Sequence, residues 1–151
     1  MDRETLRFLP VSVNITGKKI LIVGGGKVAL HKAGILSRFT DDATVVSPEF
    51  QEGFAALPFT LVKKGYEPAD LTGAFLVYVC TGDEALNERI KADCEKQKIL
   101  ASVCDSPALC DFISPAIYRE GNMTVAVSSD AQNVRQAIDV RNRIQTLKLL
   151  T

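Results

Sequence analysis

The chain has 151 residues, of which 46% are hydrophobic and 7% aromatic, so its length and composition are those of one folded domain with a small addition. Its 18 basic and 18 acidic residues give no formal net charge, which argues against bulk electrostatic attraction to nucleic acid or to an anionic membrane. The longest wholly apolar run, residues 74–80, is far shorter than the about 20 residues of a membrane-spanning helix, and the first residues do not resemble a secretory signal, so we expect a cytoplasmic protein.

Up to residue 103, the chain alternates between predicted strands and helices. Residues 18–23 contain four consecutive aliphatic side chains bounded by glycines, which is typical of a strand buried on both faces of a parallel sheet. Helices are predicted at 27–38 and from Asp83, which can cap the helix start, to about Lys96. Further strands are predicted at 43–46, 59–62, 75–80 and 99–103. This alternation predicts an α/β fold with a parallel sheet.

The pattern changes after residue 103. Two strands are predicted at 113–118 and 123–128, and the Glu-Gly-Asn sequence within the connection 119–122 favours a β-hairpin. A final helix is predicted from Ser129 and Asp130 to about residue 149. We therefore expect residues 111–151 to form a hairpin and helix appendage that serves as a dimer contact or a substrate wall.

A glycine-rich turn follows the first predicted strand. Gly24, Gly26 and Ala29 match the pattern G-x-G-x-x-A between a strand and a helix. In this pattern the first glycine makes the tight turn, the second lets the backbone approach a pyrophosphate, and the alanine allows close packing of the helix. The helix N-terminus then favours the phosphates. We interpret residues 1–110 as an NAD-binding Rossmann-like domain; a glycine-rich turn that binds nothing is the alternative.

The end of the second predicted strand bears on the choice of cofactor. An acidic residue about 20 positions after the glycines holds the adenosine ribose in such domains. Glu49 is the only carboxylate near this strand end, and Ser47 is the alternative. No arginine directly follows the strand to meet the 2′-phosphate of NADP, so we expect NAD.

The four cysteines, at positions 80, 94, 104 and 110, form no C-x-x-C pair, and the chain has a single histidine. This composition argues against a preassembled zinc site. Because a reducing compartment keeps thiols free, a disulfide framework is not expected either. We therefore predict four free, packed cysteines and no metal site; contact of Cys104 and Cys110 with iron is the less favoured alternative.

Three segments resemble the dehydrogenase module of siroheme synthase and its free-standing relatives, the precorrin-2 dehydrogenases, some of which are also sirohydrochlorin ferrochelatases. They are residues 8–29 with the glycine-rich turn, residues 103–116 with Val-Cys-Asp-Ser-Pro and Phe-Ile-Ser-Pro-Ala, and residues 125–129 with Val-Ala-Val-Ser-Ser. The resemblance implies a Rossmann-like parallel sheet with a C-terminal β-hairpin plus helix appendage. It implies NAD-dependent oxidation of precorrin-2 to sirohydrochlorin and leaves open the insertion of ferrous iron.

The resemblance also implies roles for single residues. Asp105, in the Val-x-Asp-x-Pro segment, is the candidate catalytic acid/base, because it follows a predicted parallel strand at the edge where α/β sheets hold ligands and can accept a proton. The alternative for Asp105 is a turn residue before Ser106 and Pro107. The implied cofactor-binding residues are Gly24, Gly25, Gly26, Lys27, Val28, Ser47, Pro48, Glu49 and Thr81.

The implied tetrapyrrole substrate carries several carboxylates, which arginine side chains bind well. We expect Arg135, near the start of the last helix, and Ser128 to contact this substrate, and we expect a homodimer. The alternative function is an NAD-binding regulatory (sensor) domain without catalysis. Asp105 favours the enzyme, because a sensor needs no base at the end of a strand.

Overall fold

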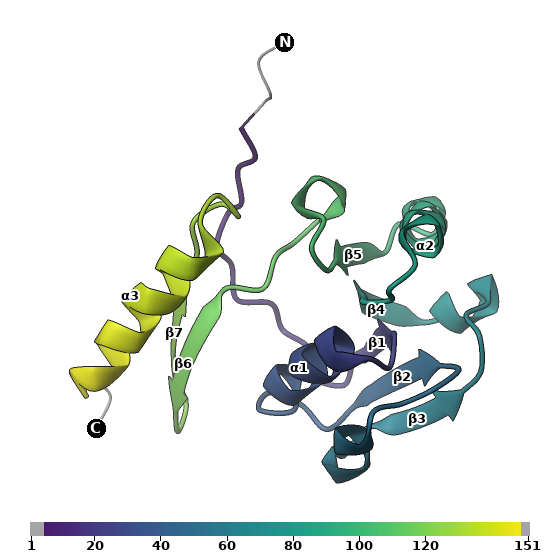
Figure 1. Cartoon of the computed structure of the whole chain (residues 1–151), viewed down its shortest axis with the longest axis horizontal. Helices are drawn as coiled ribbons and strands as arrows, with labels where there is room; N and C mark the ends of the chain where they lie inside the picture. The colour runs from purple at the N-terminus through teal and green to yellow at the C-terminus, as the bar shows by residue number, and fades with distance from the viewer. Residues whose placement is uncertain (1–4, 149–151) are drawn as a thin grey trace. The chain divides into compact units, whose positions relative to one another are not determined.

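The computed structural model describes residues 5–148, which form two compact units (Figure 1). The sheet unit contains residues 11–112, and the hairpin unit contains residues 5–10 and 113–148. The sheet unit has five parallel strands in the order β3-β2-β1-β4-β5, which is the Rossmann order. These strands are β1 (Lys19–Val23), β2 (Ala43–Ser47), β3 (Thr60–Lys63), β4 (Ala74–Val79) and β5 (Leu100–Val103). The predicted α/β class with a parallel sheet is confirmed.

The central strand β1 divides the core into two layers. Because successive side chains of a strand point to opposite faces, Ile20 and Ile22 lie on one face and Leu21 and Val23 on the other. The first face packs against α1 (Lys27–Leu36) through its small residues, and the second packs against α2 (Glu84–Lys96). The predicted cap of α2 is confirmed, since Asp83 Oδ1 accepts a hydrogen bond from the Leu86 amide at 3.1 Å. Because all five strands are parallel, their carboxyl ends lie at one edge of the sheet.

The hairpin unit contains β6 (Ala116–Glu120), β7 (Met123–Val127) and α3 (Val134–Thr146). Glu120 pairs with Met123, so Gly121 and Asn122 form a two-residue turn, and β6 begins and ends later than predicted. Pro115, which has no amide hydrogen, precedes β6 and explains its later start. Gly121 has a φ of 57°, which the turn requires.

Helix α3 begins later than the sequence predicts. Asp130 and Ala131 have φ values of 54° and 60°, which no helix accommodates, and the Phe8 amide donates to Asp130 Oδ1 at 3.1 Å. Asn133 caps the helix instead, because its side chain accepts a hydrogen bond from the Gln136 amide at 2.9 Å. The predicted end of this helix at residue 149 lies outside the described residues. None of the helices in residues 5–148 is long and apolar enough to cross a bilayer.

An ion pair between a buried lysine and an exposed aspartate holds the segment that follows β5. Lys91 Nζ on α2 lies 2.7 Å from Asp111 Oδ2, and Lys91 is only 6% exposed. Asp111 Oδ2 also accepts the Ala101 amide at 3.0 Å. Burial alone would lower the pKa of Lys91, but hydrogen bonds to Asp111 and Glu95 outweigh burial and raise this pKa above its ordinary value. The pair therefore fixes residues 104–111 against α2 and β5.

Replacing Lys91 tests this tie. We expect Lys91→Met to lower the free energy of unfolding at pH 7 by about 1–3 kcal/mol, because the Asp111 carboxylate loses its cation. Since the pKa of Lys91 is raised by folding, its stabilisation is complete below the unfolded value of about 10.4 and is lost as the pH rises through the folded value. The difference in free energy of unfolding between the unaltered chain and Lys91→Met should therefore become smaller in alkaline solution. Urea denaturation at several pH values measures this difference.

The matched control is Lys96→Met, at the exposed end of the same helix. It should change the free energy of unfolding by no more than about 0.5 kcal/mol. Equal losses in the two variants would show that the ion pair does not stabilise the fold.

Candidate functional site

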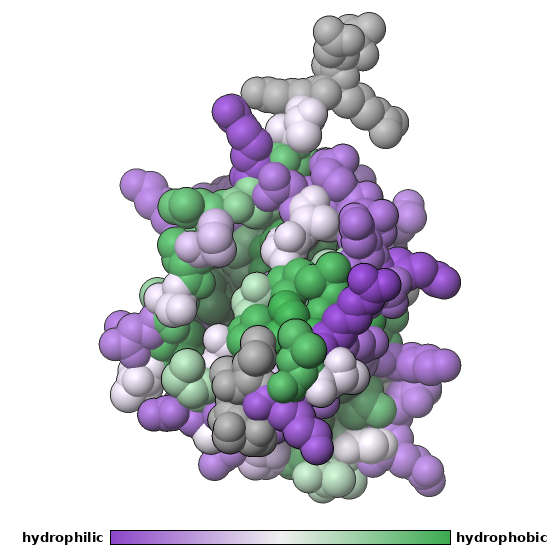
Figure 2. All heavy atoms as spheres, turned by 90° about the vertical axis from the view of Figure 1, so that its left-hand side faces the viewer, coloured by the Kyte–Doolittle hydropathy of each residue, from purple (hydrophilic) through white to green (hydrophobic). Residues whose placement is uncertain are grey.

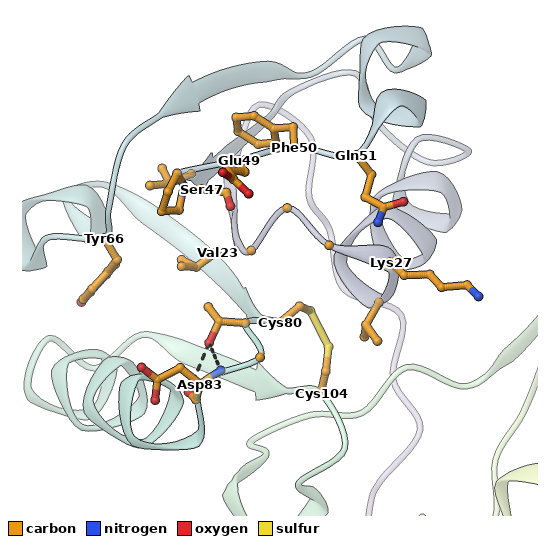
Figure 3. Close-up of a pocket in the computed structure, with 18 of the residues that line it drawn as sticks. Val23, Lys27, Ser47, Glu49, Phe50, Gln51, Tyr66, Cys80, Asp83 and Cys104 are labelled. Atoms are coloured by element: carbon orange, nitrogen blue, oxygen red, sulfur yellow. Dashed lines mark hydrogen bonds between the residues drawn. A yellow bond between two sulfur atoms is a disulfide. The ribbon is translucent and has the colours of Figure 1, made fainter.

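A crevice of about 1260 Å³ opens at the carboxyl ends of the parallel strands, within the sheet unit. Its lining residues come from the segments that follow β1, β2, β3, β4 and β5. In an open α/β sheet, ligands bind at this edge, where the chain connections diverge to opposite faces. The structure brings together here Gly24, Gly25, Gly26, Lys27, Val28, Ser47, Pro48, Glu49, Thr81 and Asp105 (Figure 3).

Glycine is found at the three positions of the turn for different structural reasons. Gly24 has a φ of 132°, and a Cβ there would overlap the backbone carbonyl of Cys80. A Cβ on Gly25 would overlap the carbonyl oxygen of Glu49. In contrast, no atom lies within 4 Å of the position of a Cβ on Gly26. Packing of the protein therefore requires the first two glycines, whereas Gly26 leaves open space that a ligand can fill.

The start of α1 fits a bound diphosphate. Gly26 is the N-cap residue, and no side chain caps the helix, so the first amide groups of α1 have no side-chain acceptor. Their dipoles favour negative charge. Ala29 is fully buried, as the close packing of α1 requires, and the Lys27 side chain extends away from the turn (Figure 3). The fit to a dinucleotide thus rests on main-chain groups and on the space beside Gly26.

The end of β2 forms the wall beside the turn. Ser47 is buried, Glu49 is exposed, and the Gln51 amide donates to the Gly25 carbonyl at 2.9 Å. This backbone bond holds the segment after β2 against the glycine-rich turn. Glu49, in this segment, therefore lies beside the turn and lines the crevice.

Residues after β3 complete this end of the crevice and were missed by the sequence analysis. Tyr66 lines the crevice, and its hydroxyl donates to Asp93 Oδ2 at 2.8 Å. Burial, followed by the hydrogen bond to Asp93, raises the pKa of Tyr66. Lys64 Nζ lies 2.7 Å from Asp70 Oδ2 and 3.5 Å from Glu67 Oε2, so carboxylates already neutralise this cation. No sequence pattern marks a loop residue such as Tyr66.

The turn after β4 is held by hydrogen bonds. The Thr81 hydroxyl bonds to the side chain of Asn87 on α2 and accepts the Asp83 amide at 3.2 Å. Asn87 Nδ2 donates to the Thr81 carbonyl at 3.1 Å. Thr81 therefore has a fixed position on the crevice wall.

Asp105 is both a turn residue and a crevice residue, so its two sequence interpretations are compatible. The Ser106 amide donates to the Val103 carbonyl at 3.1 Å and closes the turn, in which Asp105 has a φ of 63°. Aspartate tolerates this left-handed conformation better than most residues. Cys110 Sγ accepts the Val103 amide at 3.2 Å and ties the far end of the loop to β5. The exposed Asp105 carboxylate is thereby presented at the crevice.

Lys32 on α1 provides a cation near this carboxylate. Lys32 is half-buried, and burial lowers its pKa, while the charges of Cys110 and Asp105 act in the opposite direction. No sequence pattern predicts a role for Lys32. Its distance along the chain from Asp105 concealed this proximity, which depends on α1 crossing the sheet.

The prediction of four free cysteines is wrong for two of them. Cys80 and Cys104 form a disulfide, with their Cα atoms 5.2 Å apart, while Cys94 and Cys110 are free. Val79 and Val103 are register partners in β4 and β5, so the residues that follow them are neighbours. The pairing depends on the order and register of strands, which cysteine spacing alone does not reveal.

The predicted substrate residues belong to the hairpin unit. Ser128 follows β7, and Arg135 lies in the first turn of α3; both are exposed. Arg141, another arginine of α3, is held against the hairpin, because its Nη1 donates a hydrogen bond to the Ile117 carbonyl at 2.9 Å.

A protein-family model described as "Putative NAD(P)-binding" matches residues 11–116. The chain belongs to this family. Its curated relatives include siroheme synthases of Ectopseudomonas mendocina (strain ymp), 39% identical over 143 residues, and of Pseudomonas fluorescens (strain Pf0-1), 37% identical over 145 residues. Each alignment covers 93% of this chain and 31% of the relative, so the chain spans about a third of the length of these proteins.

The fold has a counterpart among solved structures. A structure titled "SirC, precorrin-2 dehydrogenase" matches 93% of this chain and 71% of that chain, with a TM-score of 0.78 and 22% sequence identity. The predicted Rossmann-like sheet with a hairpin and helix appendage is confirmed by this match. The resemblance to the siroheme synthase family is confirmed by the curated relatives.

Gly26→Val separates dinucleotide binding from folding. Valine adopts the backbone conformation of Gly26, which has a φ of −86°, and its Cβ meets no protein atom, so we expect the free energy of unfolding to change by about 1 kcal/mol or less. The side chain fills the space beside the turn, so dinucleotide binding should be lost. NADH fluorescence titration and urea denaturation measure the two effects.

Gly34→Ala on the same helix is the control, because its Cβ also meets no atom and Gly34 does not line the crevice. It should leave the dissociation constant unchanged and stabilise the helix by roughly 0.5–1 kcal/mol. Retention of binding by Gly26→Val would remove the turn from the binding site.

Proposed function

We propose that the chain binds NAD in this crevice and oxidises precorrin-2 to sirohydrochlorin, a step of siroheme biosynthesis. The observation that carries the proposal is that the Asp105 carboxylate and the open start of α1 line one crevice. When bound, NAD supplies the acceptor for the two electrons that the substrate loses. The names and similarity of the curated relatives support the same assignment.

In this proposal, different residues of the crevice bind the cofactor and accept the proton. The main-chain amides of Gly25, Gly26, Lys27 and Val28 hold the diphosphate, and Ser47, Pro48 and Glu49 contact the adenosine side. Thr81 contacts the cofactor from the end of β4. Asp105 accepts the proton that leaves the substrate during dehydrogenation. Lys32 places a positive charge near this carboxylate.

The cofactor is NAD in preference to NADP. The Glu49 carboxylate accepts hydrogen bonds from a free ribose hydroxyl and repels a 2′-phosphate. Lys64, the cation that follows β3, is already bound by Asp70 and Glu67. The end of β2 therefore favours the dinucleotide without the extra phosphate.

In this proposal the sheet unit is the NAD-binding domain, which the sequence places within residues 1–110. The hairpin unit, which includes most of the predicted appendage 111–151 and also residues 5–10, contributes the substrate wall and the dimer contact. Ser128 and Arg135 contact the substrate carboxylates. Figure 2 shows hydrophobic side chains gathered on a face that is open to solvent. The exposed large hydrophobic residues of this unit are Leu9, Met123, Val134, Ile138, Val140 and Leu147. Such a surface supports a homodimer. As a separate part of the proposal, we place the enzyme in the cytoplasm.

An assay of precorrin-2 turnover tests the proposed dehydrogenase activity. The purified chain, NAD and precorrin-2, mixed anaerobically, should yield NADH and sirohydrochlorin. Asp105→Asn should lower kcat by about 100-fold or more while the dissociation constant of NAD stays within about threefold, because the proton acceptor is lost and the turn is kept. Absorbance of both products measures the rate, and titration measures the affinity.

Asp41→Asn, which replaces an exposed carboxylate outside the crevice, is the matched control. Unchanged turnover in Asp105→Asn would remove Asp105 from the mechanism. NAD binding without any turnover of the unaltered chain would favour the regulatory domain. Ferrous iron added to the same assay tests chelation, since iron insertion changes the absorbance of sirohydrochlorin.

The proposed preference for NAD over NADP is tested by comparing the affinities of the two dinucleotides. We expect NAD to bind at least about tenfold more tightly than NADP, which corresponds to about 1.4 kcal/mol. Glu49→Gln should narrow this ratio, whereas Glu88→Gln, on the exposed face of α2, should not. Titration of each variant with both dinucleotides gives the ratios, and equal affinities in the unaltered chain would contradict the role of Glu49.

A further inference from the structure

Two cysteines meet at the floor of the crevice. Cys80 directly follows β4, Cys104 directly follows β5, and both line the crevice. The Cys104 amide donates to the Val79 carbonyl at 2.9 Å, so the backbone of the two strands brings these residues together without the help of the sulfur–sulfur bond. Their Cα separation of 5.2 Å lies in the normal range for disulfides. The bond is thus compatible with the sheet as it stands.

The pair touches the functional parts of the crevice on both sides. The Cys80 amide donates to the Val23 carbonyl at 2.8 Å, and the Cys80 carbonyl faces the Cα of Gly24, at the start of the glycine-rich turn. Cys104 immediately precedes Asp105. In Figure 3 the sulfur–sulfur bond lies between the glycine-rich turn and the strand end that carries Cys104. A change of state in this pair therefore acts on the cofactor turn and on the carboxylate at once.

The two sulfurs differ in their freedom to move and react. Cys80 is 5% exposed and belongs to the close-packed layer beneath α1, whereas Cys104 is half-buried at the edge of that layer. A small oxidant therefore reaches Cys104 first. When the bond opens, the sulfurs must separate to van der Waals contact, and Cys104 is the residue with room to turn, toward the crevice.

The other two cysteines lack these properties. Cys94 is fully buried on α2 and does not line the crevice, and burial raises the pKa of its thiol to about 11. Cys110 Sγ bonds to the backbone of Val103. Cys94 therefore serves as an internal reference thiol.

We propose that Cys80 and Cys104 form a reversible redox site in the crevice wall, and that the disulfide form binds the dinucleotide more tightly than the dithiol form. The oxidant is a low-molecular-weight disulfide. The thiolate of Cys104 attacks one of its sulfurs and releases one thiol; the thiolate of Cys80 then attacks the mixed disulfide and releases the second thiol. One protein dithiol and one small disulfide thus become one protein disulfide and two small thiols.

The coupling between the redox state of the pair and dinucleotide affinity follows from the movement of the Cys104 side chain. In the disulfide form, Cys104 Sγ is held against Cys80, and the crevice keeps the shape that has been described. In the dithiol form, Cys104 turns toward the crevice beside Asp105 and occupies part of the space that a dinucleotide needs. This coupling rests on the proposed function, whereas the redox site itself does not.

The experiment uses the full chain equilibrated anaerobically in glutathione buffers of different thiol-to-disulfide ratio. After acid quenching and alkylation, mass spectrometry should show reversible loss of two thiols, and peptide mapping should link Cys80 to Cys104. NADH titration of the two forms should give a dissociation constant at least threefold lower for the disulfide. Because linkage is reciprocal, saturating NADH should shift the exchange constant with glutathione by the same factor.

Variants assign the two sulfurs. Cys80→Ser leaves Cys104 as a reachable thiol that should take up one glutathione, whereas Cys104→Ser leaves the buried Cys80, which should not. Cys104→Ser should show the same NADH affinity in oxidising and reducing buffer, whereas Cys80→Ser should bind NADH more weakly in oxidising buffer, because the glutathione on Cys104 occupies the crevice. The control Cys94→Ala should keep the exchange constant and the threefold difference.

The outcomes separate this inference from the proposed function. Two free thiols at Cys80 and Cys104 in every buffer would overturn the redox site. A disulfide that leaves the NADH affinity unchanged, or weakens it, would overturn the coupling. Absence of NADH binding in both forms would overturn the proposed function and the coupling, while the measured exchange constant would still decide whether the redox site exists.

Discussion

The sheet unit depends on the close approach of three backbone segments at the ends of β1, β2 and β4. Gly24 lies against the carbonyl of Cys80, and Gly25 lies against the carbonyl of Glu49, at separations that leave no room for a side chain. The Gln51 amide then bonds to the Gly25 carbonyl. Because these contacts join neighbouring strands directly, they set the distance between the helix N-terminus and the crevice walls. Loss of this approach would separate the amides at the start of α1 from the wall residues.

The fold predicted from sequence follows from features that are local along the chain. Aliphatic runs bounded by glycines mark β1, and the side chain of Asp83 marks the start of α2. The glycine-rich turn is likewise a short pattern with a direct conformational meaning. Such features do not depend on which segments meet in space, and the structure contains all of them.

The errors arose where distant parts of the chain decide the local structure. The start of α3 is displaced because Asp130 accepts the amide of Phe8, 122 residues earlier in the sequence. The disulfide requires β4 and β5 to be neighbours in a particular register. Tyr66 reaches the crevice from a loop, and its hydroxyl is fixed by Asp93 on another element. None of these contacts leaves a trace in spacing or periodicity.

Asp105 combines an uncommon backbone conformation with a charged side chain at the crevice. Its positive φ is costly for most side chains, and a turn needs only a residue that tolerates this conformation. Asparagine and glycine would satisfy the turn equally well, but neither supplies a carboxylate. The surrounding structure holds the loop from both ends, through Cys104 at the start and through Cys110 and Asp111 at the end. Because the loop is restrained in this way, the backbone of Asp105 keeps a defined place at the edge of the crevice.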